Sequence, residues 1–183
     1  MCSSDHPENW QESDVYAVQV ASGAVRRLTD KRGADGSPVP SPDGSLIAYI
    51  SGDEHGDTYR NSRIHVMNRD GSGQRSISED FDRPSGGLMW APDGSGLYFS
   101  VSREGYRSLH FASVDGGVQQ LTEGKRLMTL SSFSEAGMAV GTISSAYEPG
   151  DLYRWRLDEP EDPMRLTSVN ADILHNEIGR AHV

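Results

Sequence analysis

Residues 41–50 read SPDGSLIAYI, and residues 91–100 read APDGSGLYFS. In both stretches a proline, an aspartate and a glycine precede a run of mainly apolar residues. Proline sets φ for the second position of a type I turn, and glycine takes a left-handed position that a β-branched residue avoids. Both stretches therefore predict a tight turn that leads into a buried strand. A unit of this kind that recurs after about 40–50 residues is typical of a β-propeller blade.

A second recurring feature is an apolar strand followed by a Leu-Thr pair or a near-equivalent. The strands contain the tetrapeptides VYAV, IHVM, LHFA and LYRW. The four pairs end at Thr29, Ser78, Thr122 and Thr167, which lie 49, 44 and 45 residues apart. Such regular spacing indicates one structural unit repeated along the chain.

The repeats predict an all-β fold, a partial β-propeller built from four-stranded antiparallel blades. We expect a half-blade at 14–30 and whole blades at about 37–80, 86–124 and 129–168, with a tail that extends to 177. About three and a half blades are fewer than the four to eight of a closed propeller, so the blades should form an open arc. An open arc exposes strand edges, which indicates part of a larger protein.

The remaining segments are less regular. Residues 1–13 form an N-terminal segment of unknown structure. Residues 134–137 read SEAG where the fourth unit should carry its Pro-Asp-Gly turn, and residues 159–163 read EPEDP, which predicts a solvated hairpin loop. The last six residues, 178–183, resemble translated sequencing-adapter DNA, and we expect them, including His182, to be a non-native tail.

Composition limits the partners. The formal net charge is -10 and no basic stretch is present, which argues against nucleic acid and anionic membranes. No run approaches the 18 or so apolar residues of a membrane span. The single cysteine, Cys2, excludes an internal disulfide and indicates no metal site. The cellular compartment stays open.

The sequence contains no constellation that predicts catalysis. Gly-x-Ser-x-Gly, the nucleophile elbow of serine hydrolases, is absent, and its nearest look-alikes at 71–73 and 94–96 lie in predicted turns. None of the six histidines has a partner at metal-ligand spacing. His65 and His110 occupy equivalent repeat positions, which favours a shared role in packing over a role in a site. Trp90 directly precedes a turn, where a blade core needs a large aromatic residue, so we expect it in the core. His55 lies in an acidic loop, where solvation is the simplest interpretation and a weak contact with a cation or substrate the alternative.

Several tracts carry a resemblance to a known family. YRNSRIHVMNRDGS at 59–72 and WAPDG at 90–94 resemble the propeller of prolyl-oligopeptidase-type serine peptidases, in the acylaminoacyl-peptidase and dipeptidyl-aminopeptidase-like branch. In the fourth unit, Ser144-Ser145 with Pro149, and then LTSVNADIL at 166–174, resemble the last propeller blade of that branch. The resemblance covers about residues 14–177. TolB-like propellers share the Pro-Asp-Gly repeat.

The resemblance implies a two-domain serine hydrolase in which an α/β-hydrolase domain carries a Ser, Asp and His triad. The family's propeller caps the active site and restricts entry to short peptides. None of the triad motifs is in this sequence, so we predict no catalytic, cofactor-binding or metal-binding residue here. The implied partners are the missing hydrolase domain of the same parent chain and, in the intact enzyme, peptide substrates. A stand-alone TolB-like propeller that binds proteins, or a general propeller scaffold, remains the alternative.

Overall fold

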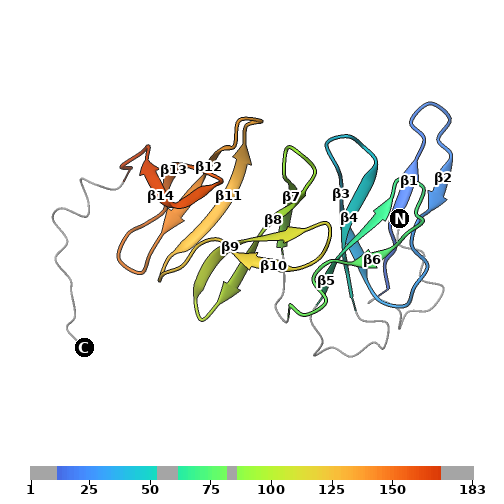
Figure 1. The fold of residues 1–183 in the computed structure, drawn as a ribbon, viewed down its shortest axis with the longest axis horizontal. Coiled ribbons are helices and arrows are strands. Elements are labelled where there is room, and N and C mark those ends of the chain that lie inside the picture. The colour runs from blue at the N-terminus through green and yellow to red at the C-terminus, as the bar shows by residue number, and fades with distance from the viewer. Residues whose placement is uncertain (1–11, 53–61, 82–85, 170–183) are drawn as a thin grey trace. The chain divides into compact units, whose positions relative to one another are not determined.

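The computed structural model describes residues 12–52, 62–81 and 86–169, and all of their regular secondary structure is β-strand (Figure 1). These residues belong to two compact units. Unit 1 contains the chain up to Val101 together with His110–Gln120. Unit 2 contains Ser102–Leu109 and the chain from Leu121 onward. One hairpin therefore contributes its base to unit 1 and its tip to unit 2.

Unit 1 begins with two separate sheets. The first is a two-stranded antiparallel sheet of β1 (Tyr16–Val18) and β2 (Val25–Arg27). The second is a four-stranded antiparallel sheet in sequence order, formed by β3 (Asp35–Pro40), β4 (Leu46–Ser51), β5 (Arg63–Asn68) and β6 (Arg75–Ser76).

The next four strands are also neighbours in sequence order. They are β7 (Gly86–Trp90), β8 (Gly96–Arg103), β9 (Tyr106–Ser113) and β10 (Val118–Gln120). Unit 2 repeats the pattern with four antiparallel strands, β11 (Leu127–Phe133), β12 (Met138–Ser144), β13 (Asp151–Arg156) and β14 (Glu159–Arg165). Within unit 2, Leu127 of β11 also pairs in parallel with Arg107 of β9.

This arrangement confirms the predicted fold class, because two strands and then three sets of four follow one another as a half-blade and three blades of an unclosed propeller. The residue bounds of the blades stay a prediction. Several sequence-based expectations lie outside the described residues: those for residues 1–11, His55, the tail at 170–177 and the non-native end at 178–183.

The Pro-Asp-Gly turns form as predicted. The Gly44 N–H donates to the Ser41 carbonyl, and the Gly94 N–H donates to the Ala91 carbonyl, each at 2.9 Å. Both glycines are left-handed, with φ of 70° and 73°. The SEAG segment makes the same turn without a proline, since the Gly137 N–H donates to the Ser134 carbonyl at 2.9 Å and Gly137 has φ of 77°.

The expected loop at 159–163 is wrong. These residues begin β14, the outermost strand of its sheet (Figure 1). An edge strand tolerates proline, because one row of its N–H groups has no partner to lose. Glu161 also bonds the Arg126 side chain and the Glu123 N–H, which ties the strand to the rest of unit 2.

The first strand of each blade carries an irregularity at one repeat position. Register shifts interrupt β3 between Gly36 and Val39, β7 between Gly86 and Met89, and β11 between Leu130 and Ser132. β3 also contains Pro38 and Pro40. Bulges and prolines are devices that keep exposed strand edges from pairing with other chains, and β3 and β7 are edge strands.

A side-chain hydroxyl joins the third and fourth strands in all four repeats, and it is buried in the first three. Thr29, Ser78, Thr122 and Thr167 each accept a hydrogen bond, at 2.9–3.0 Å, from a backbone N–H at the start of the third strand. The four donors are Val15, Ile64, Leu109 and Leu152. The carbonyls of these donors accept in return from the N–H of the Leu or Ile before each hydroxyl. This closed pair of bonds sets the register of the two strands.

Within unit 1, consecutive blades are joined by apolar clusters. Val15 and Leu28 of the half-blade pack with Tyr49 and Met67. The larger cluster holds residues from the next two blades, and Trp90 is buried in it, as the sequence predicts.

Polar bonds reinforce the same contacts in unit 1, and their acceptors are backbone carbonyls. Arg26 donates to the Asp70 carbonyl at 2.8 Å, and its repeat equivalent Arg75 donates to the Val114 carbonyl at 2.9 Å. The Trp90 indole N–H donates to the carbonyl of Val39 at 2.8 Å. The Gln74 side-chain amide likewise donates to the Leu28 carbonyl at 2.9 Å.

Gly94 tests the turn. Replacing it with Val should destabilise the fold by more than about 1–2 kcal/mol, because left-handed φ already costs an ordinary residue that much and β-branching adds to it. An added Cβ meets no atom within 4 Å, so the effect comes from the backbone alone. Gly94→Asn is the control, since Asn tolerates left-handed φ. Equal free energies of unfolding for the two variants, measured with urea, would contradict the left-handed geometry of this turn.

Thr122 tests the buried hydroxyl. Thr122→Val keeps the shape but leaves the Leu109 N–H without its acceptor, and we expect a loss of about 1–3 kcal/mol in the free energy of unfolding. Thr122→Ser keeps the hydroxyl and should lose clearly less. The measurement is urea unfolding in dilute solution. A Val variant as stable as the Ser variant would show that the bond contributes little.

Candidate functional site

Unit 1 contains a hollow of about 270 Å³ between two blades. One side is formed by the end of β6 and the residues after it, 76–81, and the other by residues 116–118, where the turn after β9 enters β10. Arg75 bridges the two sides through its bond to the Val114 carbonyl. The hollow therefore lies at a contact between blades.

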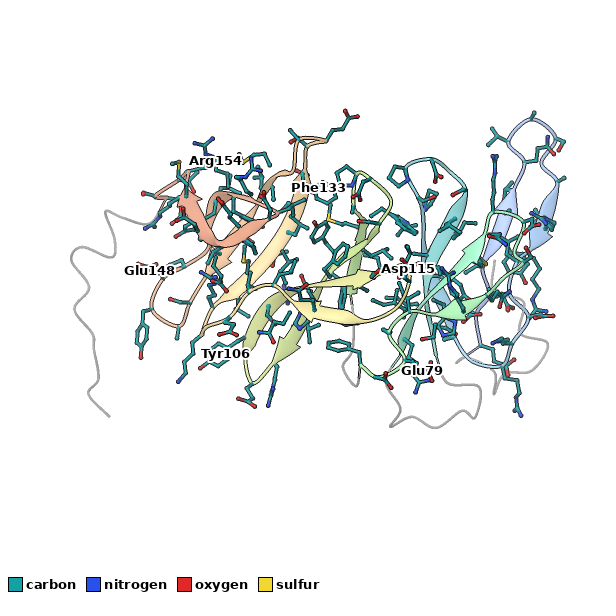
Figure 2. The ribbon with its side chains drawn as sticks, in the orientation of Figure 1. Glu79, Tyr106, Asp115, Phe133, Glu148 and Arg154 are labelled. Atoms are coloured by element: carbon teal, nitrogen blue, oxygen red, sulfur yellow. The ribbon has the colours of Figure 1, made fainter. Side chains whose placement is uncertain are left out.

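The walls of this hollow differ in chemistry. The Phe81 ring contacts the rings of Phe99 and His110, with centroids 5.8 and 5.4 Å apart. Glu79 and Asp80 are exposed beside it, and Glu79 pairs with Arg63. Figure 2 labels Glu79 and also Asp115, which precedes the glycine pair on the other side. An apolar wall beside carboxylates suits a contact surface, and no described histidine, cysteine or lysine lines it.

The two equivalent histidines pack against equivalent aromatic rings. His65 lies on Tyr49 with ring centroids 5.5 Å apart, and His110 lies on Phe99 at 5.6 Å. Burial lowers the pKa of His65, and the nearby Lys31 adds to the effect, so both favour the neutral form of the ring. This arrangement matches the packing role that the repeat predicts.

The serines of the two nucleophile look-alikes serve their own turns. The Ser72 hydroxyl donates to Asp70 at 2.6 Å, and the Ser95 hydroxyl donates to Asp93 at 2.7 Å. Each aspartate also accepts from the backbone N–H of the same serine, and these bonds lower the pKa of both carboxyls. These are the bonds of turns, and a carboxyl with a lowered pKa is too weak a base to activate a serine hydroxyl.

Sequence reasoning missed a polar cluster that the structure shows twice. In the first repeat, Arg27 bonds both the Asp14 carboxylate and the Thr29 carbonyl. In the fourth repeat, Arg165 bonds the Asp151 carboxylate and the Thr167 carbonyl in the same way. The sequence feature that could have revealed this cluster is the tripeptide RLT. It ends the first and fourth repeats and is absent from the second and third.

Asp151 is the more enclosed of the two carboxylates, and its side chain is only 2% exposed. It accepts from the Thr167 hydroxyl at 2.7 Å and from the Val169 N–H at 3.0 Å, besides Arg165. The Thr167 hydroxyl, with the Val169 N–H and Arg165, holds the pKa of the Asp151 carboxyl at about 2. These bonds hold the Asp151 carboxylate in place at the end of the last described blade.

Two classes of site find no support in the described ranges, 12–52, 62–81 and 86–169. They contain no group of three His, Cys, Asp or Glu side chains that could hold a metal ion. They also contain no helix of the length and apolar character that crossing a bilayer requires.

Comparison with known proteins gives two kinds of relative, and no protein-family model matches the chain. Dipeptidyl-peptidase 5 of Porphyromonas gingivalis is 29% identical over 145 residues, which cover 78% of this chain and 21% of that protein. The Tol-Pal system protein TolB of Francisella tularensis is 27% identical over 135 residues, which cover 74% of this chain and 26% of TolB. The chain thus spans about a quarter or less of either relative.

Solved structures agree with this picture of the fold. An acylaminoacyl peptidase of Pyrococcus horikoshii matches with a TM-score of 0.69 and 22% identity, over 91% of this chain and 24% of that one. The β-propeller domain of the Trilobed protease of Pyrococcus furiosus matches with a TM-score of 0.64 and 20% identity, over 86% of this chain and 44% of that one.

The fold and the repeated contacts define a partial β-propeller without a catalytic constellation among the described residues. More particularly, the chain resembles the propeller portion of prolyl-oligopeptidase-type serine peptidases, and the match to dipeptidyl-peptidase 5 confirms the resemblance that the sequence carries.

Asp151 generates a prediction about acid stability. Because its pKa in the folded chain lies below the ordinary value of 3.8, its ionised form stabilises the fold above that value, and this contribution is lost as the pH falls toward about 2. Asp151→Asn should destabilise the fold at pH 7, and the difference from the unaltered chain should shrink between about pH 4 and pH 2. Urea unfolding at several pH values measures it.

Asp158 supplies the control, since it also pairs with an arginine, Arg156, but is exposed. Asp158→Asn should change the free energy of unfolding much less at every pH. A constant difference between the Asp151→Asn variant and the unaltered chain across this pH range would contradict the assigned pKa.

Proposed function

We propose that the chain is the non-catalytic propeller portion of a prolyl-oligopeptidase-type serine peptidase. The observation that carries the proposal is the similarity to dipeptidyl-peptidase 5, which extends over 78% of the chain and therefore over several blades. The structure supports it, since the described side chains build contacts within and between blades rather than a reactive site.

In this proposal the intact enzyme hydrolyses short peptides, and its propeller restricts substrate entry. The partner is an α/β-hydrolase domain of the same parent chain, which supplies the Ser, Asp and His triad. This chain then contributes a rigid barrier and no chemical group. Blades that pack through buried apolar clusters change shape little, so they can exclude large substrates from the active site.

The second candidate is a TolB-like propeller that binds proteins. The observation in its favour is the 27% identity to TolB over 135 residues. The gene downstream of residue 177 distinguishes the two candidates. A Gly-x-Ser-x-Gly motif within an α/β pattern supports the peptidase, whereas further blades or a stop codon support the binding module.

The proposal predicts that the isolated chain hydrolyses nothing. The purified chain is incubated with aminoacyl-nitroanilides and short peptides, and release of product is expected at the rate seen in buffer. The reason is that the sequence contains neither the nucleophile elbow nor a recognisable triad. Turnover above buffer that survives further purification, and that co-elutes with the chain, would overturn the assignment as a non-catalytic portion.

A further inference from the structure

The chain contains five Asp-Gly pairs, and four of them lie in tight turns. The aspartates of these four turns are Asp43, Asp70, Asp93 and Asp115. In each turn the glycine N–H donates to the carbonyl of the residue three positions before it, at 2.8–3.0 Å, and the glycine has a positive φ. The four turns therefore share one backbone hydrogen bond, and they differ in the bonds that their carboxylates make.

Serines hold the carboxylates of Asp43, Asp70 and Asp93. Each carboxylate accepts a serine hydroxyl at 2.6–2.7 Å and a serine backbone N–H at 2.9–3.1 Å, from residues two positions away. These bonds lower the pKa of all three carboxyls, that of Asp43 to about 2. The three carboxylates are thus fixed beside a serine, and their ionised form is favoured.

Asp115 differs from the other three aspartates. The residue two positions after it is Gly117, which has no hydroxyl, and Asp115 itself is exposed (Figure 2). In the described part of the chain no group bonds its carboxylate. Gly116 and Gly117 have φ of 103° and 93°, and an added Cβ at either glycine meets no atom within 4 Å. Both the carboxylate and the backbone after it are therefore less restrained than in the other turns.

We propose that Asp115-Gly116 is a site of spontaneous covalent modification, at which the aspartate isomerises to isoaspartate through a cyclic imide. The Gly116 backbone nitrogen forms a bond to the Asp115 Cγ and loses its proton, and the carboxyl hydroxyl leaves with that proton as water. A second water then adds its hydroxyl to the former backbone carbonyl carbon of Asp115. The bond from this carbon to the Gly116 nitrogen breaks, and the nitrogen takes up a proton. The steps need no oxidant or cofactor, and the product has the mass of the original chain.

The first step has two requirements, which the serine bonds at Asp43, Asp70 and Asp93 oppose. The Cγ must approach the next backbone nitrogen, and this movement breaks charge-assisted hydrogen bonds in those three turns. The carboxyl must also carry a proton so that its hydroxyl can leave, and a lowered pKa disfavours that form. The fifth pair, Asp35-Gly36, is restrained differently, because Asp35 is buried and both residues pair with β4.

The modification changes the backbone between β9 and β10. In isoaspartate the main chain runs through the former side chain, which adds one methylene between Asp115 and Gly116. The flanking Val114 and Val118 pack against the larger apolar cluster of unit 1, and the Val114 carbonyl accepts the bond from Arg75. A longer backbone at this turn should displace these contacts, so we expect the isomerised chain to be less stable than the original one.

The test is the isoaspartate content of all five pairs after the folded full chain is kept at physiological temperature in mildly acidic buffer. The chain is digested with an acid-active protease, and electron-transfer fragmentation in a mass spectrometer locates isoaspartate in each peptide. Asp115 should isomerise at least about tenfold faster than Asp43, Asp70 or Asp93, because those carboxylates must first lose hydrogen bonds to a charged group. The peptide that contains Asp115 should also yield the imide, which is lighter by one water.

Three controls separate the effect of the fold from that of the local sequence. In urea-unfolded chain the four turn aspartates should isomerise at similar rates. Ser95→Ala removes the hydroxyl bond to Asp93, and it should raise the rate at Asp93 severalfold while the rate at Asp115 stays the same. Asp115→Glu keeps the charge but requires a larger ring, so this variant should keep its Tm during the incubation while the Tm of the unaltered chain falls.

Three results would overturn the proposal. The first is a folded chain in which Asp115 isomerises no faster than Asp93. The second is an unfolded chain in which Asp115 leads by the same factor, since the selectivity would then come from the local sequence. The third is a Ser95→Ala variant with an unchanged rate at Asp93, which would show that the serine bonds do not protect the aspartates.

Discussion

The structure depends on a hydroxyl that accepts a backbone N–H of the third strand or the residue before it in every repeat, and this hydroxyl is buried in the first three repeats. Thr29, Ser78 and Thr122 are almost fully buried, so that N–H could not reach water if the hydroxyl were removed. The bond also fixes where the preceding Leu or Ile points. In the half-blade that residue is Leu28, which packs against the next blade. A bond within one blade therefore positions the contact between two blades.

The same use of polar groups explains why the described residues hold no catalytic site. Polar side chains of types that can act in catalysis instead make structural contacts. Asp93 closes a turn, Asp151 fixes the end of a blade, and His65 packs against Tyr49. A scaffold of this kind suits both candidate functions. It can form a wall around an active site supplied by another domain, or a surface for another protein.

The sequence predicts those features that depend on local chemistry. The Pro-Asp-Gly turns and the Leu-Thr pairs are visible because each needs particular residue types at fixed spacing. The strand at Glu159–Arg165 is missed because two prolines normally interrupt strands, and only an edge position permits them. The Asp151 cluster is missed because its members are joined by strand pairing rather than by sequence proximity.

The side-chain bonds between blades described in unit 1 end on main-chain carbonyls, and this has a consequence for the history of the fold. Arg26 bonds the carbonyl of an aspartate, while its equivalent Arg75 bonds that of a valine, so the contact does not depend on the neighbour's side chain. A blade that offers such carbonyls can be copied, exchanged or inserted beside another without matched substitutions in its neighbour. Gene duplication and recombination could therefore change the number of blades while the sequences diverge.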